Sequence, residues 1–253
     1  MVDGRLEKWE GARVQELVQA MEVAADPETA ATLSRFFQVR PGGYGEGDTF
    51  IGIKLSSLRQ LTASYVGKPF VAADWLPLLR SPVHEHRLAA LVVMAERARR
   101  NTLRRGDPAE LQRIYQTYLA NTAYVNNWDL VDVGAKPIVG GHLQHRDRAP
   151  LYVLARSPLV WDRRIAMVGS QWFLRADETD DVFAVAELLL DDRHDLLHKA
   201  VGWSLREAGK RDPAGLRRFL DTHVGRMPRT ALRYAIEHFP EPERQSYLSI
   251  KPG

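Results

Sequence analysis

The apolar residues of this chain recur every three to four positions, which is the spacing of an amphipathic α-helix. Residues 7–25 show the pattern first, and their apolar side chains are those of Val14, Leu17, Val18, Met21 and Val23. Asp26 and Pro27 then predict a new helix start, because Asp caps a first turn and Pro fits its first position. A second helix is expected over residues 28–39, and the glycine-rich residues 40–48 predict a loop.

A recurring unit follows from residue 81 onward. It consists of a turn-like pair, a few mostly polar residues, a basic residue or Thr, and an apolar helix. The turn-like pairs are Ser81-Pro82, Ser157-Pro158, Asp192-Arg193 and Met227-Pro228. Arg164 and Lys199 open two of the apolar stretches and lie 35 positions apart, a period typical of helix-pair repeats, which run to roughly 35–45 residues.

These patterns predict an all-α protein, since no segment alternates polar and apolar residues as a strand does. Repeated helix pairs stack side by side into an α-solenoid, which curves and offers a concave face. We therefore expect residues 1–253 to form a single domain of stacked helix pairs. Basic residues at the starts of successive inner helices would line the concave face.

Composition narrows the class of protein. The 253 residues include no Cys, which excludes disulfides, a thiol nucleophile and thiolate metal sites. No apolar run approaches about 18 residues and no signal-peptide stretch is evident, so we expect a cytoplasmic protein without a membrane partner. The formal charge is only +3, but the pI is 9.2, and arginines cluster at positions 97, 99, 100, 104 and 105. Such clusters are usually solvated surface charge, yet a basic excess also favours a polyanion partner such as DNA.

Two histidine pairs are weak metal-binding candidates, His84 with His86 and His194 with His198. Neither pair has an evident acidic third ligand, so we predict no metal. No glycine-rich loop precedes a Lys-Ser or Lys-Thr pair, which disfavours nucleotide hydrolysis. The sequence therefore predicts no cofactor.

Residues 126–132 carry the strongest candidate chemistry. Either of the two residues at their start, Asn126 or Asn127, fits a helix N-cap. Trp128 and Asp132 are four residues apart, a spacing that puts an indole and a carboxylate on one helix face. An isolated pair of this kind is more often a core indole and a solvated carboxylate, so the rest of the chain has to decide.

Three motifs, in this order, resemble those of the AlkD-type DNA glycosylases, the HEAT-like-repeat enzymes of DNA alkylation repair. They are NWDLVD at residues 127–132, WDRRIA at 161–166 and KAVGWSLRE at 199–207. The resemblance extends from FIGI at residues 50–53 to the last helices, so it covers nearly the whole chain. The Trp-x-x-x-Asp and Lys-Ala-apolar-Gly-Trp motifs are specific together and weak apart.

The resemblance implies a DNA glycosylase that excises purines alkylated at N3 or N7, such as 3-methyladenine and 7-methylguanine, from double-stranded DNA. We expect the protein to be a monomer. The family needs no pocket for a flipped-out base, unlike most base-processing enzymes. Residue by residue, Asp132 corresponds to the catalytic carboxylate, and Trp128 and Trp203 correspond to two active-site indoles. Arg164 corresponds to a DNA-contacting arginine, and its neighbour Arg163 is the alternative.

Further DNA contacts are expected from Lys199, which opens a neighbouring helix, and from Arg35 and Arg40 around the second helix. In some members of the family that helix touches the minor groove. Residues 41–48 depart from the pattern, because this loop looks longer than in the best-known members. Some relatives that lack the second helix resemble the enzyme yet are inactive, so an inactive DNA-binding relative and a protein-interaction scaffold stay open as alternatives.

Elementary chemistry supports the same set of residues. An N3- or N7-alkylated purine is cationic and can leave without a general acid, while positive charge develops on the sugar as in glycoside cleavage. An ionised Asp132 would stabilise that charge and orient a water. Indoles attract a cation by about 0.5–2 kcal/mol each, and basic residues on phosphates position DNA without reading its sequence.

Overall fold

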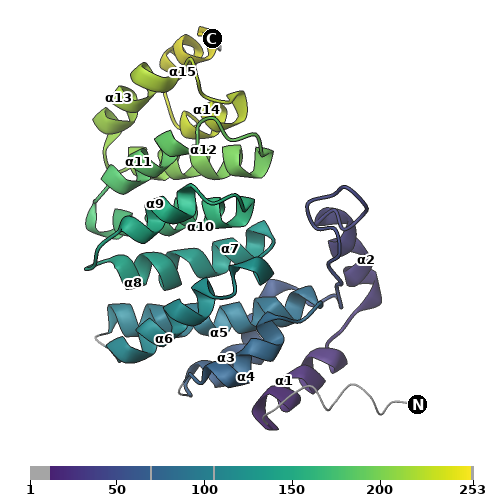
Figure 1. Ribbon diagram of the computed structural model, residues 1–253. Helices are drawn as coiled ribbons and strands as arrows, with labels where there is room; N and C mark the ends of the chain where they lie inside the picture. The colour runs from purple at the N-terminus through teal and green to yellow at the C-terminus, as the bar shows by residue number, and fades with distance from the viewer. Residues whose placement is uncertain (1–11, 69, 105, 252–253) are drawn as a thin grey trace. The chain divides into compact units, whose positions relative to one another are not determined.

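The computed structural model describes residues 12–68, 70–104 and 106–251, with the backbone alone for residues 12 and 13. Secondary structure in these ranges is helical apart from one isolated bridge between Thr49 and Val83, which confirms the predicted all-α class (Figure 1). The chain divides into two compact units, residues 1–134 and 135–253. Residues 7–11 of the first predicted helix, and Arg105, lie outside the described residues.

The first unit is built on α5 (His84–Leu103), in which every residue from 84 to 95 is buried. Three helices pack against it, α3 (Leu55–Val66), α4 (Ala72–Leu79) and α6 (Pro108–Leu119). The other elements that begin in this unit are α1 (Ala12–Val23), α2 (Pro27–Phe36), η2 (Thr122–Tyr124) and α7 (Trp128–Ala135).

The second unit is built on α10 (Val160–Ser170) and α12 (Asp195–Gly209), whose apolar faces form one core. α9 (Ala149–Ala155) packs on α10, α11 (Asp180–Leu188) packs on both, and α14 (Arg229–Ala235) packs on α12. The other elements are η3 (Lys136–Gly140, a π-helical turn), α8 (Gly141–Leu143), η4 (Phe173–Ala176), α13 (Pro213–His223) and α15 (Glu241–Ser249).

The Asp-Pro helix start predicted at residues 26–27 is confirmed. Asp26 Oδ2 accepts a hydrogen bond from the Thr29 N–H at 2.9 Å, and Pro27 is the first residue of α2. The helix is shorter than the expected 28–39, because the chain turns at Gln38, which has a left-handed φ of 54°. Residues 40–48 form turns, as predicted, and Arg40 lies in this loop rather than on the helix.

The recurring sequence unit has a common turn geometry in three of its copies. The side chain of the turn residue accepts a hydrogen bond from the backbone N–H two residues later, and the pairs are Ser81 with Val83, Ser157 with Leu159, and Asp192 with His194. The backbone carbonyl oxygen of the same turn residue forms a hydrogen bond with the side chain six residues later. These side chains are Arg87, Arg163 and His198, at 2.8, 2.9 and 2.5 Å. Each turn is thereby closed at the point where its apolar helix begins.

Candidate active site and DNA-contacting residues

The residues that the resemblance assigns fall in both units. Trp128 and Asp132 belong to the first unit, as do Arg35 and Arg40. The others, which are Arg163, Arg164, Lys199 and Trp203, belong to the second. Each set is therefore defined by the contacts within its own unit.

Helix α7 begins where the sequence predicts it. Asn127 precedes the helix, and its side-chain and main-chain oxygens accept hydrogen bonds from the N–H groups of Trp128 at 2.8 Å and Val131 at 3.1 Å. Trp128 and Asp132 are both half-buried, and their spacing places them one turn apart on one face of α7. The structure thus presents the indole and the carboxylate from one rigid element.

Trp128 packs against the aromatic residues that end α2. Phe37 stacks on the indole with ring centroids 5.3 Å apart and an interplanar angle of 26°, so it covers one face. Phe36 meets the same indole edge-on at 6.0 Å. The Trp128 Nε1–H donates to the Tyr44 hydroxyl at 3.4 Å, and that hydroxyl donates to the Phe36 carbonyl at 3.0 Å. The loop at residues 41–48 therefore docks on the candidate site through Tyr44.

Gly52 fixes the start of α2 to the rest of the first unit. Its φ is +89°, and a Cβ at this position would lie 2.0 Å from the Asp26 carbonyl oxygen and 2.7 Å from the Ala30 nitrogen. The Asp26 N–H donates to the Ile51 carbonyl at 3.0 Å. Only glycine permits this approach, which gives the FIGI motif a structural reason.

The far end of α2 exposes one aromatic and two basic side chains. Phe36 is 61% exposed although it touches Trp128. Arg35 in the last turn of α2 and Arg40 in the loop are also exposed. The two arginines that the sequence predicts as DNA contacts are therefore open to solvent, and Arg35 directly precedes the Phe36 that touches Trp128.

A buried histidine connects the loop at residues 41–48 to α7. His84 is 1% exposed, and its Nδ1 and Nε2 lie 2.8 Å from Asp48 Oδ2 and 2.9 Å from Asp129 Oδ2. Arg87 Nη2 donates to the other oxygen of Asp48 at 2.6 Å. The His84 ring also stacks on Phe50 at 4.4 Å, and Phe50 stacks on Phe37 at 5.2 Å.

The charges in this network follow from its geometry. Burial alone would lower the pKa of His84, but the hydrogen bonds to Asp129 and Asp48 raise it to about 9. Burial works against ionisation of Asp48, yet His84 and Arg87 hold the pKa of that carboxyl below its usual value. His84 is therefore an imidazolium at neutral pH. Sequence spacing could not reveal this network, because His84 is 36 and 45 positions from its two partners.

In the second unit, Arg163 is engaged by its own turn and by Asp192 of the next turn. Its Nε donates to Asp192 Oδ2 at 2.6 Å, and its Nη1 donates to the carbonyls of Ser157 and Pro158 at 2.9 Å each. Arg87 holds the equivalent position in the first unit. The Arg163 side chain therefore stabilises the turn that precedes α10.

The two other basic candidates of the second unit differ in exposure. Arg164 is 6% exposed, and its Nη1 donates to the Leu196 carbonyl at 2.6 Å, which ties α10 to the start of α12. Lys199 is far more open, with 43% of its side chain exposed, and its Nζ pairs with Asp195 Oδ2 at 2.7 Å. A phosphate can reach the lysine directly, since exposed ion pairs of this kind are weak.

Trp203 lies beside a lysine. The Lys136 Nζ is 4.5 Å from the centroid of the indole, and it donates to Gln171 Oε1 at 3.1 Å. Gln171 Nε2 donates in turn to Ser204 Oγ at 2.7 Å. The preceding Gly202 is required by packing, because a Cβ there would lie 2.4 Å from the Ala231 carbonyl oxygen on α14. Lys136 was not among the residues predicted from sequence.

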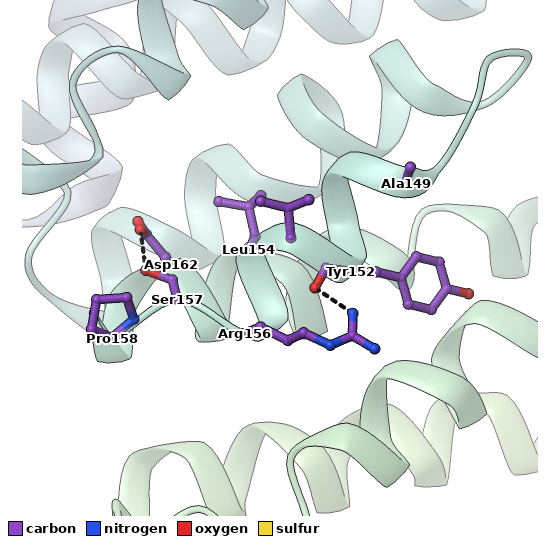
Figure 2. A pocket seen from close by; sticks show the side chains of 8 residues that line it. Ala149, Tyr152, Leu154, Arg156, Ser157, Pro158 and Asp162 are labelled. Atoms are coloured by element: carbon purple, nitrogen blue, oxygen red, sulfur yellow. Dashed lines mark hydrogen bonds between the residues drawn. The ribbon is translucent and has the colours of Figure 1, made fainter.

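A surface hollow of about 670 Å³ in the second unit holds none of the predicted site residues (Figure 2). It is formed by α9 and the turn that leads to α10. Arg156 donates to the Tyr152 carbonyl at 2.9 Å, and the Ser157 hydroxyl donates to Asp162 at 2.8 Å. The Tyr152 hydroxyl donates to Asp181 at 2.7 Å, so several polar groups of the hollow are engaged by neighbouring residues.

The histidines considered as metal ligands have protein partners. Both ring nitrogens of His84 face carboxylates, and His86 Nδ1 lies 2.9 Å from the Ser81 hydroxyl. His194 Nδ1 accepts from the Leu196 N–H at 3.2 Å. In the part of the chain that the structure describes, no group of three or more His, Asp or Glu side chains is suited to a metal ion. None of the helices in that part is long and apolar enough to cross a membrane.

The described helices and the indole–carboxylate pair on α7 place the chain among the helical-repeat proteins. Comparison of the chain with known protein families and structures narrows this class. The model of the DNA alkylation repair enzyme family matches residues 17–239, so the chain belongs to that family. A solved structure with a similar fold is a predicted DNA alkylation repair enzyme from Enterococcus faecalis. It is 18% identical with a TM-score of 0.65, and the match covers 86% of this chain and 97% of that chain. No curated protein sequence matches the chain.

Proposed function

We propose that this protein is a DNA glycosylase that hydrolyses the N-glycosidic bond of cationic N3- or N7-alkylated purines in double-stranded DNA. The observation that carries the proposal is α7, which presents Trp128 and Asp132 one turn apart and half-buried. Phe37 covers one face of that indole from within the first unit. Membership of the DNA alkylation repair enzyme family supports alkylated DNA as the substrate.

The lesion supplies its own activation in this mechanism. When the bond between the sugar C1′ and the purine breaks, its electron pair moves to the cationic base, which departs neutral. No protein acid is needed for that step. Neutral lesions such as hypoxanthine, uracil and ethenoadenine leave far less readily, so we expect the protein not to release them.

Asp132 acts on the sugar in the proposed reaction. Its carboxylate stabilises the positive charge that develops at C1′, and it orients the water that attacks there. The water oxygen forms the new bond to C1′, and the proton it loses passes through the carboxylate to solvent. The helix places this group on the same face as the indole, so both meet one nucleotide.

The indoles and the basic residues hold the substrate. Trp128 is proposed to attract the cationic base or sugar through the indole face opposite Phe37, an attraction of about 0.5–2 kcal/mol. The resemblance assigns the same role to Trp203. Arg164, Arg163 and Lys199, together with Arg35 and Arg40, are proposed to contact phosphates, which gives binding that depends on salt more than on sequence.

The decisive test is release of free base from DNA treated with a methylating agent. Under single-turnover conditions, Asp132→Asn should reduce release of 7-methylguanine and 3-methyladenine by on the order of 10²–10³-fold, the usual cost of losing a preorganised charge-stabilising group. DNA affinity should change little. A matched control is Asp180→Asn, since Asp180 is an exposed acid in the first turn of α11.

Three outcomes separate the alternatives. Loss of release in Asp132→Asn with an active Asp180→Asn supports the glycosylase. A wild-type protein that binds alkylated DNA but releases no base is the inactive relative. A wild-type protein whose affinity for DNA is negligible at low salt is the interaction scaffold.

A further inference from the structure

The network around His84 lies next to the proposed catalytic helix but contains none of the residues assigned to the reaction. Asp129 sits in the first turn of α7, immediately after Trp128, and its Oδ2 faces His84 Nε2 at 2.9 Å. The other ring nitrogen faces Asp48, at the end of the loop that follows α2, at 2.8 Å. One buried side chain thereby joins α7 to the loop.

Two carboxylates facing the two ring nitrogens require a protonated ring. A neutral imidazole has one N–H and can donate to only one of them, whereas the imidazolium donates to both. The side chains of Asp48, His84 and Asp129 are 3%, 1% and 15% exposed, so water cannot replace a lost donor easily. The bridge therefore exists in full only while His84 carries its proton.

We propose that His84 is a positioning residue for base excision, which holds the first turn of α7 against the loop after α2 and so fixes where Trp128 and Asp132 point. This inference rests on the glycosylase function proposed above. The aromatic contacts run in parallel with the bridge, since His84 stacks on Phe50, Phe50 on Phe37, and Phe37 on Trp128. A shift of α7 relative to the loop would therefore disturb both the carboxylate bridge and the indole.

The rate should depend steeply on this bridge because α7 is short, at eight residues, and carries both reacting groups on its first two turns. A displacement of about 1 Å at a catalytic group can cost about 10²-fold in rate without loss of substrate binding. DNA affinity rests mainly on phosphate contacts elsewhere. His84 should therefore affect the chemical step and leave binding nearly unchanged.

Among the described residues, the charged groups that hydrogen-bond to the His84 ring are the carboxylates of Asp48 and Asp129. Asp48 faces it from the loop and Asp129 from α7. On α5 itself, Arg87 pairs with Asp48, and Glu85 accepts the backbone N–H groups of residues 51–53. Deprotonation of His84 would leave one N–H on the ring, so either Asp48 would keep only Arg87 or Asp129 would lose its donor from this ring.

The test compares His84→Gln with His86→Gln. His86 is also buried on α5, but burial, aided by the charge of Arg87, lowers its pKa to about 4, and its Nδ1 lies against the Ser81 hydroxyl. In single-turnover release of 7-methylguanine, His84→Gln should be at least ten-fold slower, while its Kd for the same DNA should stay within two-fold of wild type. His86→Gln should match wild type in both.

A pH profile distinguishes positioning from general destabilisation. After subtraction of release from enzyme-free DNA, the wild-type rate should fall as pH rises through about 9, where His84 loses its proton. Asp48→Asn keeps the ring and α7 but removes one carboxylate, so the alkaline fall should move to lower pH. His84→Gln should show no such fall. Circular dichroism at each pH confirms that the variants are folded.

The outcomes are separable. If the wild type is active but His84→Gln keeps the full rate, the role of His84 is refuted and the glycosylase function stands. The same holds if Asp48→Asn leaves the alkaline fall in rate at its wild-type pH. A wild type that releases no base refutes the glycosylase and with it the role of His84. If His84→Gln does not fold, the displaced limb of Asp48→Asn decides.

Discussion

Trp128 and Trp203 are both expected to hold a cationic lesion, but the two units surround them differently. Trp128 has an aromatic ring against one face, with Phe37 stacked on it and Phe36 at its edge. Trp203 has a cation against its ring, since the Lys136 Nζ is 4.5 Å from the centroid. The protein thus supplies its own cation–π partner at Trp203, whereas the ring contacts of Trp128 within the described residues are with aromatic side chains.

The different surroundings of Trp128 and Trp203 change the contribution to excision that we expect from each indole. Each indole taken alone predicts the same cation–π contribution. Because a lysine already contacts Trp203, a cationic base gains less there, and Lys136 adds a positive charge that repels it. Trp128 should therefore carry most of the indole contribution to excision, and the predictions below test that difference.

The largest effect is expected on stability around Trp128, because its helix is tied down by a buried charge. Burial opposes protonation of His84, but the hydrogen bonds to Asp129 and Asp48 raise its pKa from 6.5 to about 9 in the folded protein. The contribution of the protonated ring to stability is therefore complete below pH 6.5 and is lost as pH rises through 9. Urea unfolding at pH 6 should find His84→Gln less stable than wild type by on the order of 3 kcal/mol. The gap should shrink by pH 10, and a gap independent of pH would contradict the bridge.

The next effect is on rate. Trp128→Ala should slow release of 7-methylguanine by roughly ten-fold, which corresponds to about 1.4 kcal/mol. The residual activity should keep its preference for cationic lesions, because that preference comes from the leaving group. Single-turnover kinetics measure the change, and a Trp128→Ala variant as fast as wild type would remove the indole from the mechanism.

A smaller effect is expected at Trp203. Trp203→Ala should slow release by about two- to three-fold, near the lower end of the cation–π range. In a Lys136→Met background the indole becomes available to the lesion, so the same substitution should then cost more. A double-mutant cycle of these two positions measures the difference, and a Trp203 effect at least as large as that of Trp128 would invert the comparison.

The smallest expected change concerns the phosphate contacts of the second unit. Arg164→Ala should reduce the slope of log affinity against log salt by about one unit, as expected for one lost phosphate contact. Lys199→Ala should do the same with less effect on stability, because the lysine is exposed. Fluorescence titrations of a DNA duplex at several salt concentrations give the slopes. A slope that stays at its wild-type value in both variants would rule out these contacts.

The sequence predicts those parts of the molecule that local chemistry determines. The helix start at Asp26, the loop at residues 40–48 and the start of α7 after Asn127 each follow from neighbouring residues, and the structure confirms them. The face shared by Trp128 and Asp132 follows from helix geometry alone. Helix ends are less certain, as the left-handed Gln38 shows, because Gln has no strong preference for that conformation.

The surroundings of the candidate site could not be predicted because they depend on distant segments. Phe37 and Tyr44 reach Trp128 across more than eighty positions, and His84 meets Asp129 across 45. Lys136 in η3 meets Trp203 on α12, again far along the chain. Single-sequence patterns report periodicity within a helix, but they carry no information on which helix faces which.

The hydrogen-bonded turns that precede α5, α10 and α12 have a consequence for how the chain folds. In each turn a hydrogen bond joins a carbonyl oxygen to the side chain six positions later, so the turn closes through contacts between residues that are near one another in the chain. Proteins rich in such short-range contacts fold quickly, since little chain entropy is lost before the contacts form. A nascent chain therefore forms each of these turns as soon as the following helix emerges from the ribosome. This limits the time during which the apolar faces of incompletely packed helices are exposed to aggregation.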